Sequence, residues 1–164
     1  MRYLLVDRVR EFEAGRRIVA IKNVSIESDY FDHHFPMLPI FPGALLVEAM
    51  AQSSGYLIWR SVEQLESRRV LPVLTGIGGA RFLKTVAPGD QLVIEARVSA
   101  LEWHVARTQV TAQVESEVVA RADLSFGMRH YKNQEEYSAA VQQMDMLARV
   151  LERGGTGPAR DELP

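Results

Sequence analysis

Residues 42–60 form a helix-like segment with almost no polar face, and a small protein has few places to put such a segment. The loop before it carries prolines at positions 36, 39 and 42, each of which fixes the backbone φ angle. Pro42 marks the start of a helix that runs to about Arg60, because a first-turn proline loses no hydrogen bond there. A helix that is apolar all round belongs in a core, so we expect the rest of the chain to wrap around it.

Segments in which apolar and polar residues alternate lie on both sides of this helix and predict β-strands. Two precede the helix and four follow it after a charged connection at 61–69; they span 3–13, 16–26, part of 70–90, 91–103, 104–114 and 117–129. Turn signals such as Ala14-Gly15 separate them. This order predicts an α+β fold in which an antiparallel sheet of five to six strands wraps one long central helix.

The composition changes after Tyr131. Apolar residues then recur at helical spacing, which predicts a C-terminal amphipathic helix over 131–152 packed on a main domain at 1–130. The last segment, 153–164, is rich in glycine, proline and charge and is predicted to be disordered.

Composition and charge narrow the possible functions. The chain has 164 residues, 47% of them hydrophobic, and a formal charge of -2 with no long basic run, which argues against a nucleic-acid binder. It has no cysteine, so thiolate chemistry is excluded. No apolar run is long enough for a membrane span or a signal peptide, so we expect a cytoplasmic protein. Weak basic clusters are either solvated surface or suited to an acidic protein partner: Arg16-Arg17, Arg68-Arg69, and Arg81 with Lys84.

Glu48 is the anomaly within the apolar helix, because an ionisable side chain in a core is costly unless it is paired or neutralised. Gln52 lies one turn further along the same face, where its amide can hydrogen-bond and orient the carboxyl group. Fourteen positions before Glu48, His34 lies in the stiff loop. A structural glutamate tied to a backbone donor or an arginine is one interpretation. Acid–base chemistry between His34 and Glu48 is the other.

The helix start offers a second functional element. Phe41 precedes Pro42 where a capping Ser, Thr, Asp or Asn is usual, so the amides of Gly43 and Ala44 stay available to bind a carbonyl oxygen and stabilise negative charge on it. We predict no metal site at Asp32, His33 and His34, because adjacent histidines in a stiff loop point in different directions and no third ligand follows.

Several segments resemble one known family. The stretch HFPMLPIFPGALLVEAMAQ resembles the motif of bacterial 3-hydroxyacyl-acyl-carrier-protein dehydratases, the FabZ type of the hot-dog superfamily. The segments YLLVDRV, RRIVAIKNVS and GIGGARFLKTVAPGDQL resemble the same family in the same order, so that the resemblance covers about residues 1–128. Glu48 is typical of the FabZ type, whereas the FabA type carries aspartate there.

The resemblance implies a hot-dog fold whose subunits pair, as a dimer or a hexamer, with active sites at their interface. Each site would take His34 from one subunit and Glu48 from the other. The substrate would be a (3R)-hydroxyacyl chain on acyl carrier protein, in fatty-acid or related lipid biosynthesis. The Gly43 amide would bind the thioester carbonyl, His34 would remove the α-proton, and Glu48 or water held by it would protonate the departing hydroxyl. This chemistry needs no metal or organic cofactor.

Two positions depart from the family, which usually has glycine where this chain has His33 and Met37. We expect these larger side chains to alter the choice of acyl chain rather than the reaction. Two other functions are compatible with the same residues. A hot-dog thioesterase would use Glu48 to activate water at the carbonyl, and a non-catalytic acyl-binding protein would have closed its tunnel at Met37 and His33.

Overall fold

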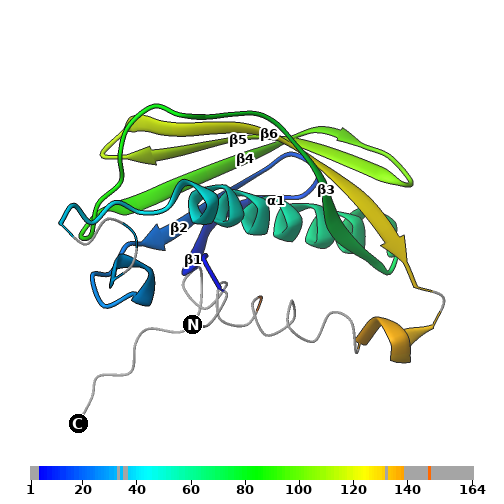
Figure 1. Cartoon of the computed structure of the whole chain (residues 1–164). Helices are drawn as coiled ribbons and strands as arrows, with labels where there is room; N and C mark the ends of the chain where they lie inside the picture. The colour runs from blue at the N-terminus through cyan, green and yellow to red at the C-terminus, as the bar shows by residue number, and fades with distance from the viewer. Residues whose placement is uncertain (1–3, 33, 35–36, 132, 139–147, 149–164) are drawn as a thin grey trace, which may run out of the picture.

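The computed structural model describes residues 4–32, 34, 37–131, 133–138 and 148, and the description below concerns these residues. Six strands and one long helix are the main elements of this part of the chain (Figure 1). In chain order the elements are β1 (Arg8–Glu13), β2 (Arg17–Asn23), a 3-10 helix η1 (Asp29–Asp32), α1 (Gly43–Glu66), β3 (Val70–Phe82), β4 (Gln91–Leu101), β5 (Val105–Val114) and β6 (Glu117–His130).

The six strands form one antiparallel sheet in the order β1-β2-β4-β5-β6-β3. β1 and β2 form the predicted hairpin, and β4, β5 and β6 form a meander. The turn between β5 and β6 has positive φ at Glu115 and Ser116, as in the tight hairpin turns whose twist matches that of a sheet. β3 returns along the outside of β6 and forms one edge of the sheet. The expected fold class, an antiparallel sheet wrapped around a central helix, is confirmed.

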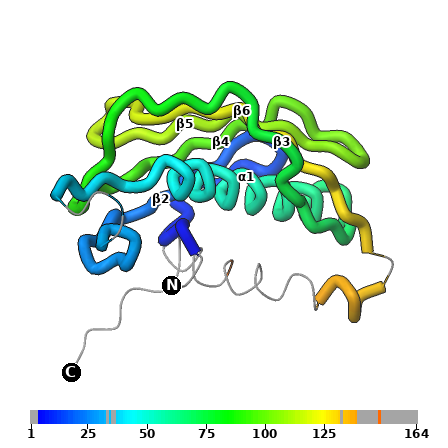
Figure 2. The backbone as a smooth tube through the Cα atoms, viewed as in Figure 1, coloured from blue at the N-terminus to red at the C-terminus, as the bar shows by residue number. Residues whose placement is uncertain are grey.

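The helix α1 lies in the concave side of the curved sheet, as Figure 2 shows. Alternate residues of each strand face it: Leu92, Ile94 and Ala96 of β4 are buried, while the residues between them are more exposed. Leu57 and Ile58 of α1 are fully buried in the same core. Burial of each such large side chain contributes about 1.5–3 kcal/mol to the stability of the fold.

The helix is longer than the sequence suggested. The predicted end was near Arg60, but α1 continues to Glu66 through the segment expected to be a charged connection. Ser61 and Val62 are fully buried, which keeps this last stretch packed against the sheet despite its charged neighbours. The helix then ends at Ser67, which adopts the left-handed conformation with φ 50°.

Only part of the predicted C-terminal helix falls on described residues. Residues 134–138 are helical, and Tyr137 is buried against the main domain. The rest of the prediction for 131–152 lies outside the described residues, apart from Ala148, and so does the tail at 153–164. Within the described residues, no helix combines the length and the apolar character needed to cross a bilayer.

Candidate active site

His34 is held in place at both its backbone and its ring. Its N–H donates to the carbonyl oxygen of Tyr30 across 2.9 Å, which continues the turn of η1. Its ring Nδ1 lies 2.9 Å from the carbonyl oxygen of Ile40. Because a carbonyl oxygen can only accept a hydrogen bond, Nδ1 carries the proton and the lone pair of the neutral ring lies on Nε2. The contact with Ile40 thereby fixes the orientation of the ring.

An aromatic cluster connects this loop to the start of α1. The ring of Tyr30 packs against Phe31, with centroids 4.7 Å apart, and meets Phe41 edge-on at 5.4 Å. Phe31 and Phe41 are buried, and the N–H of Phe41 donates to the carbonyl of Val86. Burial raises the pKa of the Tyr30 phenol, and the nearby Asp7 carboxylate also raises it. The tyrosine therefore stays neutral at ordinary pH and serves as a packing element.

Glu48 and Gln52 form a fixed pair on α1. The Gln52 Nε2 donates to Glu48 Oε1 across 3.0 Å, and the Gln52 Oε1 accepts from the backbone N–H of Leu5 across 2.9 Å. Since the Leu5 amide can only donate, it determines which end of the glutamine amide faces Glu48. The structure thus contains the orienting contact that the spacing suggested, together with a backbone partner that the sequence did not reveal.

Glu48 is less buried than expected. The sequence placed it in a core, but it is half-buried in the chain, and Ala44 one turn earlier is exposed. The physical reason is that the sheet covers only one side of the first turns of α1, whereas Ser53 to Trp59 are buried continuously. Ala44, Glu48 and Gln52 follow one another at i, i+4 spacing, so they form a single stripe on the side of the helix that the sheet leaves open.

The start of α1 has the features of an anion-stabilising site. Pro42 precedes it with no side-chain cap, and the first turn contains no acidic residue. The earliest amides of a helix have no acceptor within the helix, so the N–H groups of Gly43 and Ala44 and the helix dipole favour negative charge. A Cβ on Gly43 would lie only 3.0 Å from the ring of Phe82. Glycine at 43 therefore lets the end of β3 close over the helix start.

The structure brings most of the predicted site residues to one end of the molecule. Gly43 and Ala44 lie about one turn before Glu48, and the Ile40 carbonyl that holds His34 lies just before the helix start. Within the described residues, neither a hydrogen bond nor an ion pair joins His34 to Glu48. In the described part of the chain, no group of three or more His, Cys, Asp or Glu side chains is arranged to hold a metal ion.

Sequence reasoning missed three contributors. The Leu5 amide and the Ile40 carbonyl are backbone groups, for which a sequence carries no specific signal. Phe82 packs against Gly43 from far along the chain. It belongs to the segment GIGGARFLKTVAPGDQL, whose resemblance to the family was the only available indication.

Comparisons with known proteins agree with this geometry. The helix wrapped by an antiparallel sheet defines the class as a hot-dog protein. The structure of this chain is similar to that of the dehydratase heterocomplex ApeI:P from Xenorhabdus doucetiae (TM-score 0.60, 20% identity, 88% of this chain and 95% of that one). It also matches a thioesterase from Haemophilus influenzae (TM-score 0.60, 15% identity, 77% and 80%). At these identities the structural matches establish the fold alone.

The sequence comparisons are more specific. The model of the FabA-like domain matches residues 1–123. The 3-hydroxyacyl-[acyl-carrier-protein] dehydratase FabZ of Listeria monocytogenes is 40% identical over 126 residues, which is 77% of this chain and 85% of the relative. FabZ of Cronobacter sakazakii is 46% identical over 122 residues, 74% and 80% respectively. The chain belongs to the FabA-like family and is of the FabZ type, as the resemblance indicated.

Proposed function

We propose that this protein dehydrates (3R)-hydroxyacyl chains carried on acyl carrier protein to trans-2-enoyl thioesters, in fatty-acid or related lipid biosynthesis. The observation that carries the proposal is the contact between His34 Nδ1 and the Ile40 carbonyl, which orients the histidine ring in a chain of the FabZ type. The fixed pair of Glu48 and Gln52 supplies the acid that the same reaction needs.

The reaction follows from these three elements. The thioester carbonyl accepts a hydrogen bond from the Gly43 amide, which stabilises the negative charge that develops on its oxygen. His34 Nε2 takes the α-proton as the bond from carbon to hydrogen breaks. Glu48 in its acid form, or water held by it, gives a proton to the 3-hydroxyl group, which leaves as water while the double bond forms. Transfer of a proton from the His34 imidazolium back to the Glu48 carboxylate completes the cycle.

We further propose that the working site joins two copies of this chain, with His34 from one and Glu48 from the other. The edge strand β3 supports this pairing, because it carries exposed apolar side chains at Val73, Ile77 (53% exposed) and Phe82 (54% exposed). Met37 is 97% exposed in the loop that follows His34. Exposed apolar side chains on an edge strand are a usual feature of an interface between copies.

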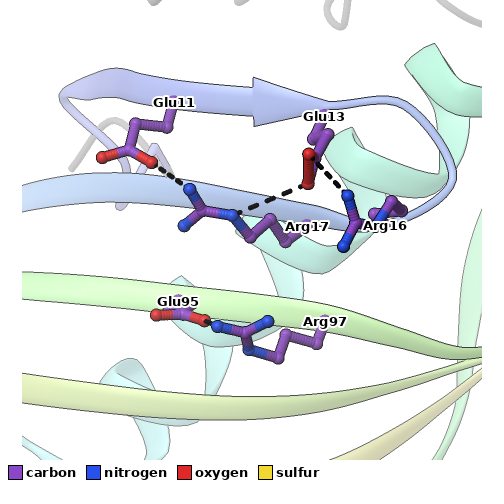
Figure 3. Close-up of polar contacts among 6 residues, drawn as sticks. All are labelled: Glu11, Glu13, Arg16, Arg17, Glu95 and Arg97. Carbon is purple, nitrogen blue, oxygen red and sulfur yellow. Dashed lines mark hydrogen bonds and ion pairs between the residues drawn. The ribbon is translucent and has the colours of Figure 1, made fainter.

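The basic clusters bear on the proposal of acyl carrier protein, an acidic partner. Arg16 and Arg17 of the first basic cluster pair with Glu11 and Glu13, as Figure 3 shows. Lys84 likewise pairs with Glu117. These three cations are therefore partly neutralised within the chain.

Arg81 differs from them. It lies directly opposite Arg121 in the β3–β6 pairing, and among the described residues neither arginine forms an ion pair. Two cations facing each other across a sheet repel, so an acidic partner beside Phe82 would relieve the repulsion. Arg81→Glu should raise KM for the carrier-bound substrate and leave KM for a small pantetheine thioester unchanged.

The direct test of the function is product analysis with a 3-hydroxyacyl thioester. Formation of the trans-2-enoyl thioester, lost in Glu48→Gln, supports dehydration. Release of free thiol without enoyl product would instead identify a thioesterase. Binding of the acyl chain with neither product would identify a non-catalytic acyl-binding protein.

A further inference from the structure

We infer that a pocket beside the edge strand β1 binds a phosphate group. The pocket has a volume of about 280 Å³ and is lined by Asp7, Arg8, Arg10, Ile21, Asn23 and Gln91. A water molecule takes up about 30 Å³ in the liquid, so the pocket has room for a phosphate ion together with several waters. The inference does not depend on the proposed dehydration, because none of these residues takes part in that reaction.

Two arginines supply the positive charge of the pocket. Arg8 and Arg10 are both exposed, and neither forms an ion pair with another described residue. Arg8 lies opposite Ile21 in the sheet, whereas the register shifts between Val9 and Glu11, which makes Arg10 the extra residue of a β-bulge. A bulge changes the direction of a side chain, and both arginines line the pocket. The guanidinium group offers paired N–H donors that match the oxygens of phosphate.

The carboxylate in the lining of the pocket is already neutralised. Asp7 forms an ion pair with Lys22 at 3.2 Å and accepts a hydrogen bond from the backbone N–H of Asn23 across 2.6 Å. The Lys22 side chain is only 13% exposed, so its ammonium group is held against Asp7. The charges of Asp7 and Lys22 cancel, which leaves the two positive charges of Arg8 and Arg10. A phosphate dianion balances these charges better than a single carboxylate does.

The two amide side chains of the pocket are oriented by each other. Gln91 Oε1 accepts a hydrogen bond from Arg10 Nη2 across 3.3 Å, and Gln91 Nε2 donates to Asn23 Oδ1 across 2.8 Å. Since the oxygen of Asn23 is the acceptor in this contact, its amide nitrogen is the group left to donate. The pocket therefore presents N–H donors from Asn23 and from the two arginines, which is the chemistry that phosphate oxygens need.

A larger polar pocket elsewhere on the sheet has a different balance of charge. Its volume is about 380 Å³, and the guanidinium groups of Arg97 and Arg121 in its lining are matched by the carboxylates of Glu95 and Asp123. Arg97 forms an ion pair with Glu95, as Figure 3 shows. Positive and negative side chains are equal in number there, so we expect no phosphate binding. This pocket provides a matched control.

The test measures binding of inorganic phosphate by calorimetry, at a low ionic strength held constant with chloride. Arg8→Gln and Arg10→Gln should each weaken binding by about tenfold or more, the usual cost of losing a charge-assisted hydrogen bond. Arg97→Gln makes the same change in the charge-balanced pocket and should bind phosphate as wild type does. Arg8→Lys keeps the charge without the paired donors and should bind with intermediate affinity.

Thermal unfolding provides a second readout and shows which variants fold. Phosphate should raise the Tm of wild type in a concentration-dependent way, because a ligand that binds only the folded state stabilises it. The double variant Arg8→Gln/Arg10→Gln should show no such rise. If this double variant does not fold, Arg8→Lys/Arg10→Lys takes its place and should show a smaller rise than wild type.

Two sources offer a phosphate group of this kind, namely free phosphate compounds and the phosphopantetheine arm of a carrier protein. A phosphopantetheine thioester that binds at least about tenfold more tightly than inorganic phosphate would identify the arm as the source. Equal affinity would identify a free phosphate compound. Either result, when lost in the double variant, supports the site.

Three results would overturn the inference. They are no phosphate binding by wild type, equal binding by wild type and the folded double variant, and a loss in Arg97→Gln as large as in the Arg8 and Arg10 variants. The last result would indicate general attraction between charges rather than a site. Binding is measured without turnover, so a wild type that binds phosphate and forms no enoyl product would contradict the proposed function alone.

Discussion

The side-chain amide of Gln52 donates a hydrogen bond to the carboxylate of Glu48 across 3.0 Å. The backbone of Leu5 fixes the orientation of that amide, so the N-terminal segment, the central helix and the proposed acid form one unit. The position of the Glu48 carboxyl group is therefore determined by a contact 47 residues away in sequence from Gln52.

The two hydrogen bonds of the Gln52 side chain can be tested separately. Gln52→Glu retains an oxygen that accepts from Leu5 but replaces the donor to Glu48 with a second carboxylate, which repels the first. We expect turnover to fall by about 10²-fold, because small misplacements of a reacting group cost that much. Stability should fall less than in Gln52→Ala, which loses both bonds. Equal turnover in wild type and Gln52→Glu, measured by enoyl formation, would argue against an orienting role.

A substitution at His34 can remove the proposed base and keep the hydrogen bond to the Ile40 carbonyl. Asparagine at this position carries an N–H donor for the Ile40 carbonyl but offers no basic nitrogen. His34→Asn should lower kcat by about 10²–10⁴-fold, the usual contribution of a general base, with little change in thermal stability. His34→Ala should lose comparable activity and also some stability. Retained activity in His34→Asn would show that the ring is structural.

The ring of Phe82 limits the size of the side chain that fits at position 43. A methyl group at Gly43 would lie 3.0 Å from the Phe82 ring, so Gly43→Ala should destabilise the fold by about 1–3 kcal/mol through overpacking. Phe82→Ala removes the ring and should relieve this cost in the double variant. A thermal double-mutant cycle measures the coupling, and strictly additive changes would contradict direct contact between the two positions.

Tyr30 should make stability depend on alkaline pH. Burial raises its pKa above the ordinary value of 10.0, so the folded state holds the phenolic proton more tightly than the unfolded state does. This contribution is complete below pH 10 and is lost as the pH rises through the raised pKa. Wild type should therefore lose more stability than Tyr30→Phe in denaturant titrations carried from neutral to strongly alkaline pH. Parallel losses in the two proteins would contradict a raised pKa of the partly buried Tyr30.

Local patterns predicted the elements built from local contacts. The central helix was predictable because apolar residues dominate every side of the segment 42–60. The alternation of apolar and polar residues predicted the hairpin and the meander. The family resemblance carried by HFPMLPIFPGALLVEAMAQ was confirmed by the comparisons. The spacing of Glu48 and Gln52 also anticipated their hydrogen bond, because residues four apart are neighbours on any helix.

Features that depend on contacts between distant parts of the chain could not be predicted from local sequence patterns. The helix extends past Arg60 because Val62 is buried by the sheet, and no local signal distinguishes that valine from one in a loop. Glu48 is half-buried because the sheet covers only one side of the first turns, which depends on how the strands curve. The roles of His34, Glu48, Gly43, Ala44 and Gln52 in catalysis, and the boundary between the domain at 1–130 and the added helix, stay predictions.

We propose that each dehydration site is built from two copies of the chain, so that a dimer holds two sites. Co-expression of His34→Ala and Glu48→Gln chains with different tags, followed by purification on both tags, isolates the mixed pair. In a mixed dimer one site carries both defects and the other carries none, so enoyl formation should return to about half of the wild-type rate. Each variant alone should be nearly inactive. A mixed pair no more active than the separate variants would contradict a site built from His34 of one copy and Glu48 of the other.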